Sequence, residues 1–145
     1  MKKLVTIILF LSFFISKSKA QVAISYNPFQ SVIGIGADSD KQLWFDLRIA
    51  TNTFIANTNL ELNLFYNFSV KEQANIYVGA GVNFNPFNGY QNVSIINGYD
   101  VVVGSRIKPF EKFPKGFIQF EISPYVNRYF DSGRLRTMLG LGYNL

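Results

Sequence analysis

The 145-residue chain contains no cysteine and no histidine, and only 16% of its residues are charged. Without cysteine there is no disulfide framework and no thiol nucleophile. Without histidine the chain lacks the commonest general base and the usual ligands of zinc sites. Soluble domains carry about 25% charged residues, so the charge that normally coats a water-facing surface is scarce here. The length suits a single domain.

Positive charge outside the first twenty residues is also scarce. The formal net charge is +5, but Lys2, Lys3, Lys17 and Lys19 contribute four of the fourteen basic residues. The rest of the chain carries ten basic against nine acidic side chains. Because nucleic-acid binding needs a clustered basic face, we expect no nucleic-acid partner.

Residues 1–20 have the pattern of a signal peptide. Lys2 and Lys3 precede an apolar run over residues 4–15, and Ser18 and Ala20 place small residues at a cleavage site. Twelve helical residues span about 18 Å, too short for a hydrocarbon core of about 30 Å. We therefore predict an exported protein whose mature domain covers residues 21–145. No cysteine follows the cleavage site to carry a lipid anchor.

The mature chain is dominated by alternation of apolar and polar residues with period 2, which indicates β-strands. Turn-forming residues separate these runs. Eight strands of about ten residues use up the chain and predict an all-β fold, an eight-stranded antiparallel up-and-down transmembrane β-barrel. The expected strands cover residues 22–26, 31–37, 43–50, 60–69, 76–84, 99–107, 118–127 and 135–145.

The first two expected strands are the weakest, and Pro28 leaves their register open. An even strand number puts both termini on the periplasmic side of an outer membrane. The connections near residues 38–41, 70–75 and 108–116 are then periplasmic, and the remaining four face outward.

The less apolar face of the strands carries charges of both signs. In a narrow interior each charge needs a partner, because unpaired buried charge is costly. The alternative is solvated surface pairs worth less than about 1 kcal/mol each. Glycines on this face are expected to make room for long Arg and Glu side chains, and Phe65 and Tyr77 to help fill the lumen. The expected interior charge network consists of Asp46, Arg48, Glu61, Asp100, Arg106, Glu121 and Arg136.

Aromatic residues gather toward the ends of the expected strands. Rings of this kind form interfacial girdles in membrane barrels, although they equally serve as core fillers. Trp44, Phe117, Tyr129, Phe130 and Tyr143 are among them.

The last expected strand carries the spacing of an outer-membrane insertion signal, with Gly140, Tyr143 and Leu145 at the glycine, aromatic and terminal positions. Met138 stands where a polar residue is usual, and Leu145 where Phe or Trp is usual. With this strand and the overall pattern, the chain resembles small outer-membrane β-barrel proteins of the Bacteroidota type, and more loosely the OmpA/OmpX-like barrels. The resemblance implies outer-membrane lipid and the barrel-insertion machinery as partners.

The sequence gives little support for an enzyme activity. Small-barrel enzymes of the outer membrane rely on a histidine, which this chain lacks, and its carboxylates have arginines with which to pair. We expect no enzyme activity, no cofactor and no metal. The outward segment suited to binding a partner is Pro86, Phe87, Asn88, Gly89 and Tyr90, with an ordinary capped hairpin as the alternative.

The sequence thus favours a non-enzymatic outer-membrane barrel with a structural or accessory role. A companion hypothesis makes it a small subunit of a larger outer-membrane complex for insertion, export or uptake. The alternative from another class is a secreted or periplasmic soluble β-barrel that binds an apolar ligand in its core.

Overall fold

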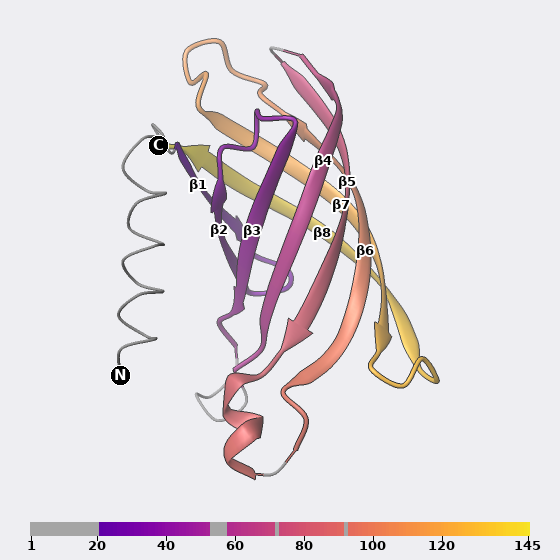
Figure 1. Cartoon of the computed structure of the whole chain (residues 1–145). Helices are drawn as coiled ribbons and strands as arrows, with labels where there is room; N and C mark the ends of the chain where they lie inside the picture. The colour runs from indigo at the N-terminus through magenta and orange to yellow at the C-terminus, as the bar shows by residue number, and fades with distance from the viewer. Residues whose placement is uncertain (1–20, 53–57, 72, 92) are drawn as a thin grey trace, which may run out of the picture.

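The computed structural model describes residues 21–52, 58–71, 73–91 and 93–145. Within these ranges eight antiparallel strands follow one another around a closed barrel, in which the last strand pairs with the first (Figure 1). The predicted all-β, eight-stranded barrel is confirmed. The strands are β1 (Val22–Asn27), β2 (Val32–Ala37), β3 (Leu43–Ala50), β4 (Leu60–Val70), β5 (Ala74–Phe84), β6 (Ile96–Ile107), β7 (Gly116–Asn127) and β8 (Gly133–Asn144).

The first two strands are shorter than the average of ten residues expected for the barrel, and their bounds lie within one residue of the expected 22–26 and 31–37. β1 and β2 have six residues each, whereas β6, β7 and β8 have twelve. β1 ends before Pro28, which lacks the N–H that a strand pairing would use. The structure settles the open register, because Ala23 pairs with Gly36 and Tyr26 with Ile33.

The two ends of the barrel differ. One end, which we call the terminal end, holds both termini of the barrel and the β2–β3, β4–β5 and β6–β7 connections, at the top of Figure 1. The other end, the loop end, holds the remaining connections, including the 3-10 helix η2 (Pro86–Gln91). The predicted signal peptide over residues 1–20 and part of the β3–β4 loop, 53–57, lie outside the described residues.

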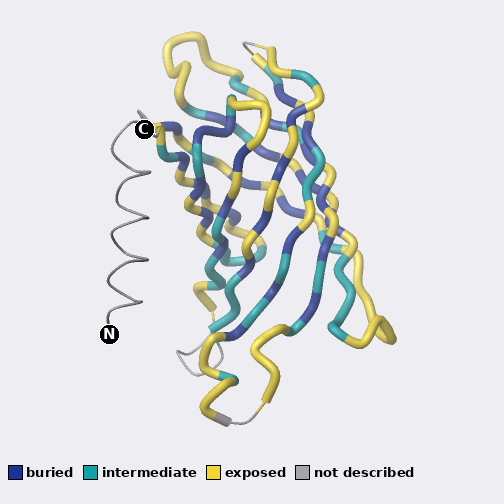
Figure 2. Tube along the Cα trace, in the orientation of Figure 1, coloured by how far each residue is buried: buried dark blue, intermediate teal, exposed yellow. Residues whose placement is uncertain are grey.

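Burial alternates along most of each strand, as the banding in Figure 2 shows, but residues 133–135 at the start of β8 are all exposed. The outward positions are apolar and exposed; Leu64 and Val103, for example, each expose about half of their side chain. The inward positions are mostly polar, and buried polar side chains outnumber buried hydrophobic ones. The buried hydrophobic residues are Ala23, Trp44, Phe65, Tyr77, Val102, Phe117 and Met138. The barrel therefore has an apolar outer wall around a polar interior.

Two of the predicted girdle aromatics lie inside the barrel. Trp44 is 2% exposed and Phe117 is 3% exposed. Trp44 stacks on Phe65, with ring centroids 4.1 Å apart. Its position explains this placement, because Trp44 lies two residues before Asp46 on β3 and so shares its inward face. Of the two alternatives left open by the sequence, girdle residue or core filler, the second holds for these two residues.

The inward glycines make room chiefly for rings. A Cβ atom at Gly79 would lie 2.3 Å from the Phe65 ring, and one at Gly104 would lie 2.6 Å from the Tyr77 ring. The expectation that these glycines accommodate Arg and Glu side chains is wrong here. Gly79 pairs with Phe65 and Gly104 with Tyr77 across adjacent strands, so each ring lies over the glycine beside it.

Candidate functional site

The barrel interior holds an ion network centred on Arg48 of β3. Its guanidinium lies 2.8 Å from Glu121 of β7, 3.0 Å from Asp46 and 3.6 Å from Glu61 of β4. Glu121 also accepts a 2.7 Å hydrogen bond from the Tyr77 hydroxyl. The four side chains of the Arg48 cluster are almost fully buried, so each charge depends on its neighbours rather than on water.

Arg136 of β8 extends this network toward the loop end. Its guanidinium lies 2.6 Å from Glu61 and 3.0 Å from Asp100 of β6. Ser123 connects the same groups, because its hydroxyl donates to Asp100 and accepts from Arg136. The structure therefore brings together six of the seven charged residues of the predicted network.

The seventh, Arg106 of β6, lies apart from the carboxylates. Its Cζ is 4.0 Å from the Trp44 ring centroid and 4.5 Å from that of Phe117. Among the described residues it forms no ion pair, and its Nε and Nη1 atoms lack hydrogen-bond partners. The network is thus four carboxylates around two guanidiniums, while Arg106 is held by aromatic faces.

Polar groups close the terminal end of the barrel, on the other side of the ring cluster formed by Trp44, Phe65, Tyr77 and Phe117 from the ion network. The Asn67 amide donates to the backbone oxygens of Ser39 and Lys41, at 2.8 and 2.6 Å. Lys108 forms an ion pair with Asp40. Together with the buried rings of Trp44, Phe65 and Tyr77, these groups occupy the lumen, and the interior of an eight-stranded barrel is only wide enough for side chains.

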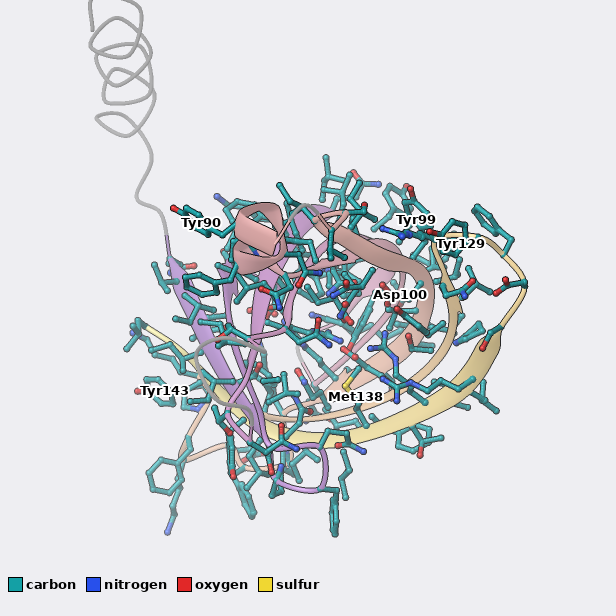
Figure 3. The ribbon with its side chains drawn as sticks, turned by 90° about the horizontal axis from the view of Figure 1, so that it is seen from below. Tyr90, Tyr99, Asp100, Tyr129, Met138 and Tyr143 are labelled. Atoms are coloured by element: carbon teal, nitrogen blue, oxygen red, sulfur yellow. The ribbon has the colours of Figure 1, made fainter. Side chains whose placement is uncertain are left out.

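The loop end instead opens into a cavity of about 540 Å³. Arg48, Glu61 and Arg136 form part of its lining, together with Met138 of β8. Figure 3 looks along the barrel from this end and shows Met138 inside the ring of strands. The ion network therefore borders this cavity through Arg48, Glu61 and Arg136, and residues of the β1–β2 turn, Phe29 and Gln30, line it as well.

Sequence reasoning missed Arg134, which also lines this cavity. It stands one residue before the expected start of the last strand. The sequence could have identified Arg134, because it lies two residues before Arg136 and strand alternation puts both side chains on one face.

The predicted external loop forms the helix η2, not a plain turn. The Asn85 side chain accepts from the Phe87 N–H at 2.9 Å, and the Asn88 amide donates to the Ser94 oxygen at 3.1 Å. Tyr90 is 88% exposed and lies at the outer edge of the barrel in Figure 3. Pro86, Phe87, Asn88, Gly89 and Tyr90 thus form a short ordered loop that presents an aromatic ring to the surroundings.

The residues of the predicted insertion signal lie where β8 meets β1. Gly140 faces inward, where a Cβ would lie 2.2 Å from the Asn27 side-chain oxygen. Tyr143 and Leu145 are exposed, and the Leu145 N–H donates to the Val22 oxygen at 2.8 Å. Recognition by insertion machinery stays a prediction.

Comparisons with known proteins add no assignment. No family model matches the chain, and no curated protein matches it. The described residues contain no helix of the length and apolar character needed to cross a membrane.

Proposed function

We propose that this protein is a non-enzymatic outer-membrane β-barrel with a structural or accessory role, acting as a small subunit of a larger outer-membrane complex. The observation that carries the proposal is the outer wall. Its exposed side chains are apolar on β1 to β7, and on β8 Thr137 and Arg134 are the exposed polar residues beside exposed leucines; the charged side chains of the other strands are buried inside the barrel. Monomeric soluble proteins rarely expose a contiguous apolar patch beyond a few hundred Å².

Strand dimensions support a membrane location. β4 to β8 have eleven or twelve residues, enough for tilted strands that cross a hydrocarbon core. Exposed aromatic residues lie near both ends of the wall. Tyr66 and Phe68 contact each other near the terminal end, and Tyr99 stacks on Phe130 near the loop end. Two such belts suit the two membrane–water interfaces.

The interior supports a structural role rather than catalysis or transport. Glu61 and Glu121 are held by arginines, and the filled lumen favours no solute passage. We infer that the protein acts through its wall and its loops. A core-bound apolar ligand is not favoured, because the buried side chains are predominantly polar.

The test is mild-detergent extraction of the membrane fraction, followed by gel electrophoresis with and without boiling. We expect the protein in the membrane fraction, with a mobility that changes on boiling because the closed barrel resists detergent until heated. Stoichiometric extra bands retained before boiling support the subunit role. Recovery in the soluble fraction without a mobility change overturns the membrane location.

A further inference from the structure

β8 has twelve residues, twice as many as β1, the strand with which it closes the barrel. β1 pairs with β8 only from Ala23–Asn144 to Tyr26–Leu141. In Figure 1 the β1–β2 hairpin ends at mid-height, whereas β8 continues toward the loop end. Among the described residues, no strand pairs with residues 133–139 of β8 on this side; we call this segment the β8 edge.

The directions in which the backbone N–H and C=O groups of the β8 edge point can be deduced from the part of β8 that pairs with β1. The Asn144 N–H donates to Lys115, toward β7, and the Leu145 N–H donates to Val22, toward β1. Because these directions alternate along a strand, the N–H and C=O groups of Leu135, Thr137 and Leu139 point toward the β1 side. There Thr137 O accepts from the Gln30 side chain. Residue 28, which would stand opposite Leu139, is a proline without an N–H.

The side chains of the β8 edge are apolar on the outer face of the strand and include two arginines on the opposite face. Leu135 is 69% exposed on the outer wall, and Leu139 is also exposed there. Arg134 and Arg136 belong to the other face and line the cavity. Arg134 lies 5.4 Å from the centroid of the Tyr125 ring, and among the described residues no carboxylate lies within 4.0 Å of its guanidinium.

We propose that the β8 edge binds an extended segment of a partner outer-membrane protein by strand addition. The inference rests on the proposed membrane location, where unpaired backbone groups in hydrocarbon cost several kcal/mol each. The partner strand alternates apolar residues that face lipid with polar residues on the other face, where an acidic residue lies opposite Arg134; Arg136 is already paired with Glu61 and Asp100. It would continue the sheet beyond the end of β1.

A second copy of this chain suits the edge poorly. Strand addition between two copies is twofold and antiparallel, so pairing centred on Leu135 or Arg136 brings arginines of the two copies opposite each other. Like charges opposite each other destabilise a pair of strands. Charge therefore favours a different, acidic partner.

The test uses detergent-solubilised protein and a fluorescein-labelled nine-residue peptide of alternating valine and glutamate. A peptide with lysine in place of glutamate is the control. By fluorescence anisotropy we expect the glutamate peptide to bind at least tenfold more tightly, and Arg134→Glu to reverse that order. Thr137→Pro, which removes one N–H from the edge, should weaken binding at least tenfold, whereas Thr137→Ala should bind like the unaltered protein.

The boiling-dependent mobility of each variant separates the two proposals. If the barrel keeps its mobility change but does not distinguish the peptides, strand addition is overturned and the membrane location stands. If sedimentation shows a dimer that Thr137→Pro dissociates, a second copy occupies the edge and the acidic partner is overturned. If the unaltered protein is soluble and shows no mobility change, the membrane location itself fails.

Discussion

Arg48 and Arg106 are both buried, yet their surroundings differ in charge. Arg48 contacts three carboxylates, from β3, β4 and β7. Arg106 contacts the faces of Trp44 and Phe117 and, among the described residues, no carboxylate. Removing the centre of an ion network leaves its partners uncompensated, whereas removing an unpaired buried charge relieves a desolvation cost.

Arg48→Met should therefore lower the free energy of unfolding by about 3–5 kcal/mol, because three buried carboxylates lose their shared cation. The measurement is urea unfolding of the detergent-solubilised protein, followed by fluorescence of Trp44, the single tryptophan. Arg106→Met is the matched control, with an expected change within about 1 kcal/mol or a gain. Equal losses for both variants would contradict the separation of Arg106 from the network.

Alternation along single strands predicted which charges share a face, but not which of them pair. Asp46 and Arg48 stand two residues apart, so their common face follows from period 2. The contact between Arg48 and Glu121 joins strands that are not neighbours in the sheet. It depends on the register and closure of the whole barrel, which local patterns do not encode.

Between neighbouring strands, inward glycines leave the space that the aromatic ring of the adjacent strand occupies. Gly104→Ala should lower stability by about 1–3 kcal/mol, because the added Cβ would meet the Tyr77 ring at 2.6 Å. Gly89→Ala is the matched control, since its Cβ would meet only Ile95, at 3.6 Å. Urea unfolding of both variants makes the comparison; an unchanged Gly104→Ala would contradict the packing.

The two faces of β4 make opposite predictions. Leu62→Arg places a charge on the outer wall and should reduce insertion into lipid vesicles by about 2–4 kcal/mol at mid-bilayer. Glu61→Gln, its inward neighbour, should change insertion much less, because it removes one carboxylate from a network with excess negative charge. The measurement is the fraction of protein with boiling-dependent mobility after refolding with vesicles at increasing urea. Equal effects would contradict the assignment of the faces.

Element bounds were predictable along most of the chain, including the two short first strands. β4 and β5 follow the expected ranges within two residues. β1 and β2 also match the expected ranges, 22–26 and 31–37, within one residue. Pro28 was visible in the sequence, but the unpaired half of β8 depends on how far both strands extend at the closure.

For the whole molecule, buried rings and ion pairs occupy the lumen of the described barrel, and its cavity of about 540 Å³ lies toward the loop end. We expect no channel steps when the protein is added to a planar bilayer in salt, because aromatic rings and the ion network occupy the lumen. Stable unitary conductance would contradict this interior.

The proposed membrane location rests on the apolar outer wall, and contact between this wall and lipid can be measured directly. Trp44 faces the interior, whereas Leu64 is 55% exposed on the wall. In vesicles of lipids with brominated acyl chains, we predict little quenching of Trp44 in the unaltered protein and strong quenching of the added emission in Leu64→Trp. A Leu64→Trp variant whose emission is not quenched, or which stays outside the vesicles, would contradict the account.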